Sequence, residues 1–311
     1  MSAFALKSIA LVGLGEAGRT YYELLAEFPE LHLEAVIDGG QEGPSLGTEC
    51  TFRSIREMLD RGRIPQLAVI CSHPRDHASH TETLLGLGVD VLVTPPLAMT
   101  QEAADHVAAL AEQAGRIACT AAPFRAFPAL RESRRTIESG RIGRLCSIEC
   151  SLSEKRDGRT GGGVWMENGP HAIDVVETLA GPAERIRMLS RTSLQGGPVE
   201  DAVSVEVEHR DQLVSRISLT WNEGRNAPIA RCIGDRGEIA IGRTQSILRT
   251  EDGQETLLDG LYSEREGHRG VLREFLATCR APEHAIDHGA ESVAWIHAAY
   301  RSLELGRWEL C

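Results

Sequence analysis

The chain has 311 residues, of which 42% are hydrophobic and 25% charged, and its formal net charge is -12. This length suits two domains of ordinary size, each able to bury its own core. The acidic balance and the lack of any Lys/Arg-rich run argue against a nucleic-acid partner, because such a partner requires a basic face. The acidity alone identifies no other partner.

The sequence carries no sign of export or membrane insertion. A core strand is reached by Ile9 with no basic n-region or long apolar h-region before it. No apolar run is long enough to cross a bilayer. The eight cysteines are scattered without C-x-x-C pairs, as expected of reduced thiols. We therefore expect a cytoplasmic protein with no membrane partner.

The first forty residues carry a nucleotide-binding pattern. Apolar strands are predicted over Ser8–Val12 and Leu33–Ile37, with a helix between them. The glycine-rich turn from the first strand into the helix matches the dinucleotide-binding fingerprint in its required context. The predicted cofactor-binding turn consists of Gly13, Leu14, Gly15, Glu16, Ala17 and Gly18.

Each glycine of this turn has a separate physical task. Gly13 permits the tight turn, Gly15 lets the backbone approach a pyrophosphate, and Gly18 lets the helix pack closely on the sheet. The anion would lie on the free N–H groups of the helix N-terminus. Asp38, at the end of the second strand, can hydrogen-bond an adenosine ribose and would repel a 2′-phosphate. We therefore expect NAD, with NADP less favoured.

The alternation of strand and helix continues to residue 120. Helices of ten to fifteen residues between short apolar runs are typical of parallel βαβ units. We predict a Rossmann-type doubly wound parallel sheet over residues 1–120. The further strands expected are Leu67–Cys71, Val89–Val93 and Arg116–Thr120, and the helices are Ser54–Arg61, Ala78–Leu87 and Gln101–Gly115.

After Ala121 the pattern changes to that of an α+β domain. Val203, Val205 and Val207 alternate with polar residues, which indicates a mostly antiparallel open sheet with one packed face. We predict that residues 121–311 form a substrate and oligomerisation domain. Its expected helices are Pro128–Ser139, His171–Leu179 and Gly289–Leu305, and its strands are Arg144–Leu152, Arg185–Ser193, Ala202–His209, Leu213–Trp221, Ile229–Gly234, Glu238–Gly242 and Gln245–Thr250.

With these motifs placed, the chain resembles the Gfo/Idh/MocA family of NAD(P)-dependent oxidoreductases over essentially its whole length. Residues 72–77, S-H-P-R-D-H, look like the family's T-P-P-x-x-H turn. Residues 91–100, V-L-V-T-P-P-L-A-M-T, stand where the family has V-L-V-E-K-P-L-A-x-T, and residues 161–174 match G-G-G-x-x-x-D-x-G-x-H-x-x-D. The resemblance places Ser72, His73, His77, Thr94 and Pro95 against the cofactor.

The family's E-K-P lysine falls on Pro95. In the family that lysine hydrogen-bonds the reacting oxygen and assists proton transfer, whereas a proline side chain can neither donate nor accept a proton. The departure indicates a changed reaction, a lost reaction or a relocated proton carrier.

His171 matches the family's catalytic histidine, and an imidazole with an unperturbed pKa of about 6.5 suits general acid/base work. Glu167 replaces the family's aspartate four residues earlier. On a helix this spacing places both side chains on one face, so the acid can orient the imidazole or contact a substrate hydroxyl. The alternative is an ordinary helix-start histidine near an acid.

The loop with Lys155 and Arg156 follows the Arg144–Leu152 strand, in a region that borders the substrate pocket in the family. We expect Lys155, Arg156 or Arg159 of this loop to supply positive charge to the site, with Lys155 as a catalytic candidate and Arg156 as a substrate ligand. The alternative is a solvated loop of mixed charge.

Three more residues are substrate-binding candidates through the resemblance. Arg125 lies in a segment like the family's substrate-side R-x-F, although it could form an interdomain ion pair instead. Asp174 is the last residue of the segment that matches G-G-G-x-x-x-D-x-G-x-H-x-x-D. Trp165 could be a pocket wall or part of the core.

No metal site is expected. His73, His77 and His80 have a spacing that could ligate a metal, but no nearby cysteine or carboxylate triad completes a zinc site. Relatives pair through the open face of the second-domain sheet, so the resemblance implies a homodimer or homotetramer.

The residues and the resemblance favour an NAD-dependent oxidoreductase that acts on a carbinol or ketone of a small, polar substrate such as a sugar, cyclitol or hydroxy acid. Two alternatives stay open. Some relatives retain NAD and use a transient oxidation to cleave a glycosidic or related bond with no net redox change. One branch of the family binds the cofactor and acts as a regulator without catalysis.

Overall fold

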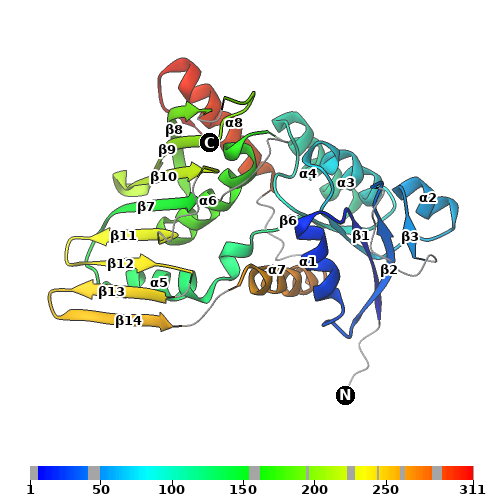
Figure 1. Cartoon of the computed structure of the whole chain (residues 1–311), viewed down its shortest axis with the longest axis horizontal. Helices are drawn as coiled ribbons and strands as arrows, with labels where there is room; N and C mark the ends of the chain where they lie inside the picture. Colours follow the sequence, from blue (N-terminus) through cyan, green and yellow to red (C-terminus); the bar gives the residue numbers. More distant parts are fainter. Residues whose placement is uncertain are drawn as a thin grey trace. The chain divides into compact units, whose positions relative to one another are not determined.

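The computed structural model describes residues 6–40, 50–153, 162–193, 196–222, 228–243, 245–259, 263–281 and 289–310. The chain divides into two compact units, whose elements are labelled in Figure 1. Unit 1 comprises Met1–Ala121 and His268–Val293, and unit 2 comprises Ala122–Gly267 and Ala294–Cys311.

Unit 1 is built on a six-stranded sheet in which every neighbouring pair of strands is parallel. Its strands are β1 (Lys7–Val12), β2 (Leu31–Ile37), β3 (Thr51–Phe52), β4 (Leu67–Ile70), β5 (Asp90–Val93) and β6 (Ala118–Thr120). The order β3-β2-β1-β4-β5-β6 runs outward in both directions from the centre, which is the order of a doubly wound dinucleotide-binding sheet. The predicted Rossmann-type sheet is confirmed.

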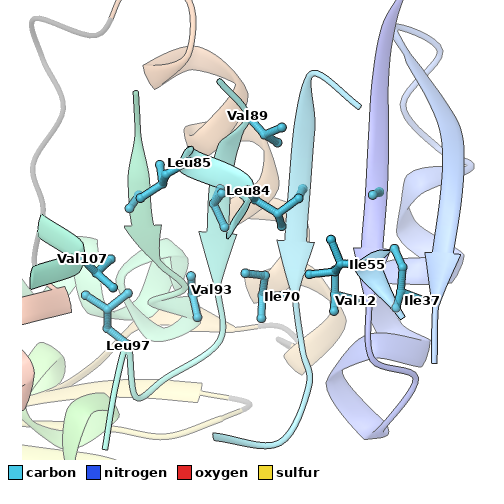
Figure 2. Close-up of a cluster of buried hydrophobic side chains, with 14 of the residues drawn as sticks. Val12, Ile37, Ile55, Ile70, Leu84, Leu85, Val89, Val93, Leu97 and Val107 are labelled. Carbon is cyan, nitrogen blue, oxygen red and sulfur yellow. The ribbon is translucent and has the colours of Figure 1, made fainter. Parts of the chain in front are cut away.

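Helices cover both faces of this sheet, because successive strand residues point to opposite sides. The helices are α1 (Glu16–Leu25), α2 (Ile55–Asp60), α3 (His77–Leu85), α4 (Gln101–Ala114) and α7 (Glu264–Thr278). On one face α2, α3 and α4 pack on the strands, and Figure 2 shows Val12, Ile70 and Val93 there with Leu84 and Leu85. On the other face α1 and α7 cover a second apolar cluster.

Local sequence explains the ends of α4. The hydroxyl of Thr100 caps its start by accepting a hydrogen bond from the Ala103 N–H at 3.2 Å. Gly115 ends it in the left-handed conformation, with φ of 59°, which glycine adopts without strain.

Helix α7 is missing from the sequence prediction, and its position differs from the predicted domain boundary. The prediction assigned every residue after 120 to the second domain, whereas His268–Val293 belongs to unit 1. The physical reason is apolar packing. The buried α7 side chains Val271, Leu272, Phe275 and Leu276 belong to the same cluster as Ile9 and Leu11 of β1.

Unit 2 contains a nine-stranded sheet of order β14-β13-β12-β11-β7-β10-β9-β8-β15. Only β7 and β10 pair in parallel, so the predicted mostly antiparallel sheet is confirmed. The strands are β7 (Leu145–Ser153), β8 (Ala183–Thr192), β9 (Ala202–His209), β10 (Val214–Thr220), β11 (Ala230–Gly234), β12 (Gly237–Ile241), β13 (Gln245–Thr250), β14 (Gly253–Asp259) and β15 (Glu309–Leu310).

Two helices pack on this sheet: α5 (Pro128–Glu138) lies on β12 to β14, and α6 (Val164–Ala180) lies on β7, β9 and β10. The last helix is α8 (Gly289–Leu305). The sequence predicted a start for α6 at His171, but the helix begins seven residues earlier and continues through Pro170. None of the helices in the described part of the chain has the length and apolar character that a bilayer crossing requires.

The packing of α7 predicts a stability effect. Phe275→Ala removes a ring that is 2% exposed in the core of unit 1, so we expect a loss of about 3–5 kcal/mol of unfolding free energy. The exposed neighbour change Glu274→Ala is the matched control and should stay within about 0.5 kcal/mol of wild type. Denaturant unfolding measures both. Equal effects of the two changes would contradict the placement of α7 in this core.

Candidate functional site

The turn between β1 and α1 is sterically closed at two of its three glycines. Gly13 has φ of +93°, and a Cβ on it would lie 2.5 Å from the carbonyl oxygen of Cys71. A Cβ on Gly18 would lie 2.1 Å from the carbonyl oxygen of Gly13. The helix therefore packs on the turn at a distance that only glycine permits.

Gly15 is different, because the protein itself leaves room for a side chain there. Its φ of -61° suits any residue, and a Cβ on it would meet no atom within 4 Å. Gly15 precedes α1, and no side chain caps the helix start. Open space and uncapped N–H groups together fit a pyrophosphate lying against the backbone. Around it Leu14 is buried, Ala17 is half-buried and Glu16 is exposed.

Asp38 directly follows β2 at the same edge of the sheet. Its N–H donates to the carbonyl oxygen of Phe52 at 2.9 Å, and its carboxylate accepts the N–H of Gly40 at 3.3 Å. The side chain is half-buried. Because β1 and β2 are parallel neighbours, the carboxylate lies beside the glycine turn, where the fingerprint places the ribose.

Four more predicted cofactor residues come to this edge. Ser72 and His73 follow β4, and Thr94 and Pro95 follow β5. The two strands are parallel neighbours, and the ladder continues past their ends, because the Thr94 N–H donates to the carbonyl oxygen of Ile70 at 2.9 Å. The fold therefore gathers these residues at the carboxyl ends of the strands, where open α/β sheets bind ligands.

His77 is buried behind this edge and connects its loops. Its Nδ1 lies 2.7 Å from the carbonyl oxygen of Pro96, and its Nε2 lies 2.8 Å from that of Ser72. Burial lowers the pKa of the ring. Both ring nitrogens contact backbone, so His77 links the loop that carries Ser72 to the loop that carries Pro95 and Pro96.

The neighbouring histidines are engaged in local contacts. His80 Nδ1 lies 3.0 Å from the hydroxyl of Ser72, and the His73 ring accepts the N–H of Arg75 at 3.3 Å. Within the described ranges, no group of three or more His, Cys, Asp or Glu side chains is placed to hold a metal ion.

In unit 2, helix α6 carries the candidate proton-transfer residues. Glu167 and His171 are both half-buried, and their spacing places them on one face of α6, one turn apart. The ring of His171 packs on Phe124, with ring centroids 5.7 Å apart. Phe124 lies in a short 3-10 helix, Pro123–Ala126, and sequence reasoning did not single it out.

Arg125, next to this phenylalanine, forms a buried ion pair with Asp174 of α6. Its Nε and Nη2 lie 2.8 and 2.5 Å from one carboxylate oxygen, and Nη2 also lies 3.7 Å from Glu177. Burial raises the pKa of Asp174 to about 6, and the charge of Arg125 opposes that rise. Both residues belong to unit 2, so the pair is not interdomain. It fastens the 3-10 helix to α6 beside His171.

The remaining predicted site residues are Trp165, Lys155 and Arg156. Trp165 is fully buried, and its indole N–H donates to the carbonyl oxygen of Ile296 at 3.2 Å, which places it in the core of unit 2. Lys155 and Arg156 lie outside the described residues, as does Arg159.

An uncapped glycine turn on a doubly wound parallel sheet is typical of proteins that bind a dinucleotide. Sequence comparison gives the family. Residues 7–122 match the oxidoreductase family with an NAD-binding Rossmann fold, and residues 130–240 match the Gfo/Idh/MocA C-terminal domain. The chain therefore belongs to the Gfo/Idh/MocA family of oxidoreductases, and its cofactor is NAD.

Individual relatives are distant. The rhizopine catabolism protein MocA of Rhizobium meliloti is 23% identical over 210 residues, which span 64% of this chain and 66% of that protein, just under two thirds of its length. An oxidoreductase from Agrobacterium radiobacter, solved with NAD+, L-tartaric acid and magnesium, has a TM-score of 0.82 at 16% identity over 97% of each chain. GenD2 from gentamicin A biosynthesis, solved with NAD, has a TM-score of 0.82 at 20% identity over 100% of this chain and 98% of that one. These structures share the fold.

The glycine turn predicts that cofactor binding and stability respond separately to one added methyl group. In Gly15→Ala the methyl group enters open space, so the unfolding midpoint should stay unchanged while NAD binding weakens at least about tenfold. In Gly18→Ala the methyl group meets the Gly13 carbonyl, so stability should fall by about 1–3 kcal/mol. Thermal unfolding and NAD titration by calorimetry measure the two effects. Wild-type NAD affinity in Gly15→Ala would rule out binding of the pyrophosphate against the backbone at Gly15.

The burial of Asp174 predicts a pH effect on stability. The folded protein holds the proton of this carboxyl up to about pH 6, whereas in the unfolded chain the proton is lost near the ordinary value of 3.8. The stabilising contribution of the group is therefore complete at low pH and is lost as the pH rises to about 6. The unfolding free energy of wild type minus that of Asp174→Asn should fall by about 2 kcal/mol between pH 4 and 6.5.

Urea unfolding at a series of pH values measures this difference. Asp252→Asn, at an exposed position of unit 2, is the control for general pH effects. A difference between wild type and Asp174→Asn that stays flat with pH would show that burial does not govern this carboxyl.

Proposed function

We propose that this chain is an NAD-dependent oxidoreductase that interconverts a secondary alcohol and a ketone on a polar small molecule. The observation that carries the proposal is the row of Glu167, His171 and Asp174 on α6. A histidine with a carboxylate one turn away is suited to take a proton from a hydroxyl group and to return it. The bound nicotinamide supplies the hydride chemistry.

In this proposal His171 is the general acid/base. Its contact with Phe124 fixes one face of the ring, and Glu167 orients the imidazole or binds a substrate hydroxyl. The Arg125–Asp174 pair keeps the phenylalanine segment on α6 and presents charge beside the histidine. A small substrate with several hydroxyl groups, or a hydroxy acid, suits these surroundings.

Pro95 supports a second candidate function. It stands where the resemblance expects the lysine, so the proton role of that lysine must be carried by another group or be absent. Lys155 and Arg156 are candidates for this group. If none replaces it, the chain is a retained-NAD enzyme with no net redox change or a cofactor-binding regulator.

We further propose that the protein works in the cytoplasm as a homodimer or homotetramer. The chain's cysteines support a reducing compartment, because every cysteine in the described ranges is a free thiol. The polar face of the nine-stranded sheet is the surface through which copies would pair.

The proposed roles predict specific losses of activity. The wild-type protein is tested with NAD+ on a panel of a cyclitol, a sugar and a hydroxy acid, namely myo-inositol, D-glucose and L-tartrate, by absorbance at 340 nm. On a substrate found there, His171→Asn should lower kcat/KM by about 10²–10⁴-fold, and Glu167→Gln should lower it less. NAD affinity should stay unchanged in both variants. His106→Asn, at an exposed histidine of α4, is the matched control.

The outcomes separate the candidate functions. Cleavage of a glycoside, tested with methyl α-D-glucopyranoside beside the panel, without a change at 340 nm indicates the retained-NAD enzyme. NAD binding with no product from any substrate of the panel indicates the regulator. Full activity of His171→Asn on a turned-over substrate removes His171 from the mechanism.

A further inference from the structure

Helix α6, which carries the proposed catalytic pair, begins without a cap of its own. The residue before it is Gly163, which has no side chain and has φ of +98°. The first N–H groups of a helix have no partner within the helix and need one from elsewhere. Serine, threonine, aspartate or asparagine normally supplies it from the position that this glycine holds.

Glu200, which lies just before β9, supplies these partners from a distant part of the sequence. Its carbonyl oxygen accepts the N–H of Val164 at 3.0 Å, and its carboxylate accepts the N–H of Trp165 at 3.3 Å. The first two helical N–H groups are therefore both satisfied by one residue outside the helix.

The carboxylate of Glu200 is itself held by two more donors. The Tyr300 hydroxyl donates to it at 2.6 Å, and Arg191 Nε donates at 2.9 Å. The side chain of Glu200 is only 1% exposed, and the guanidinium of Arg191 lies over the Tyr300 ring, 5.1 Å from its centroid. Burial raises the pKa of Tyr300, so its hydroxyl stays a donor. A buried carboxylate in such a network resists displacement, because any shift leaves charge unpaired.

Gly163 is part of the same arrangement. A Cβ on it would lie 2.3 Å from a carboxylate oxygen of Glu200, and the positive φ would strain any other residue. The glycine is therefore required by the position of the carboxylate, which lies against the backbone at the start of α6.

Glu167 is the residue that depends most directly on this start. Its N–H is the first to close a helical turn, on the carbonyl oxygen of Gly163 at 3.1 Å. His171 lies one turn further along the helix. A first turn that frays or rotates would move Glu167 first and alter its relation to His171.

We propose that Glu200, held by Tyr300 and Arg191, is a positioning residue that fixes the first turn of α6 and thereby the geometry of Glu167 and His171. This inference rests on the proposed function, since it assigns a supporting role to a residue that does not touch the reacting atoms. Glu200 acts from the segment before β9 through the backbone N–H groups of α6, so its effect should appear in kcat while NAD binding is unchanged.

Three variants test the proposal. Glu200→Gln keeps the shape and one acceptor but removes the charge, and Tyr300→Phe removes a single hydroxyl. Glu138→Gln is the matched control, because Glu138 also pairs with an arginine, Arg134 at 2.8 Å, but on the exposed side of α5. The measurements are amide hydrogen exchange of the peptide that covers residues 164–168, kcat and KM on the panel substrate, and NAD affinity.

We expect faster exchange in this peptide for Glu200→Gln and Tyr300→Phe, and a fall in kcat of about 10–100-fold with KM for NAD within twofold of wild type. Glu138→Gln should match wild type in all three. In a double-mutant cycle, the effects of Glu200→Gln and Glu167→Gln on kcat should be non-additive, because both changes disturb the carboxylate of Glu167.

The inference is overturned if Glu200→Gln and Tyr300→Phe exchange like wild type, or if exchange rises while kcat stays unchanged on a substrate for which Glu167→Gln is impaired. Additive effects in the cycle would also overturn it. If wild type turns over no substrate of the panel, the proposed function fails. The exchange data then still decide whether Glu200 holds the first turn.

Discussion

Backbone N–H groups at the start of a helix must find partners, and two helices with candidate functional residues, α1 in unit 1 and α6 in unit 2, meet this requirement in opposite ways. Both begin after a glycine. At α1 no side chain caps the helix and Gly15 faces open space, so the N–H groups remain available to a phosphate. At α6 the glycine makes room for the carboxylate of Glu200, which closes the helix start. The start of α1 is left open by the protein, whereas the start of α6 is closed by a side chain from elsewhere in the chain.

Two buried carboxylates flank the segment of α6 that contains the proposed catalytic pair. Glu200 with Arg191 holds its first turn, and Asp174 with Arg125 holds it three residues beyond His171. Each arginine comes from a different element, so the pairs act as ties between α6 and its neighbours. In both pairs the carboxylate is buried and the arginine is partly exposed, and displacing a buried carboxylate from its partner is costly because it leaves a charge unpaired. The segment between the two ties contains Glu167 and His171.

Much of the first unit could be predicted from sequence because its signals are local. Short apolar runs and the glycine turn identify β1, α1 and the edge that gathers Ser72 and Pro95. The start of α6 could not be predicted, because its cap comes from Glu200, 37 residues after Gly163, and Pro170 obscures the helical pattern. Helix α7 was missed because charged residues surround its apolar positions, although Val271, Leu272, Phe275 and Leu276 do have helical spacing. Which unit that helix joins depends on packing that no local pattern reports.

The side chain of His77 faces two hydrogen-bond acceptors, although a neutral imidazole has only one N–H to donate. Its two nitrogens face two carbonyl oxygens, of Pro96 and of Ser72, yet a neutral imidazole has a single N–H. In the neutral ring, the protonated nitrogen donates a hydrogen bond to the carbonyl oxygen of one loop. The other nitrogen presents a lone pair to the carbonyl oxygen of the other loop. A second proton would complete both bonds, but burial opposes it. The loop with Ser72 and the loop with Pro96 therefore share one ring proton, and the ring tautomer decides which of the two loops accepts the hydrogen bond.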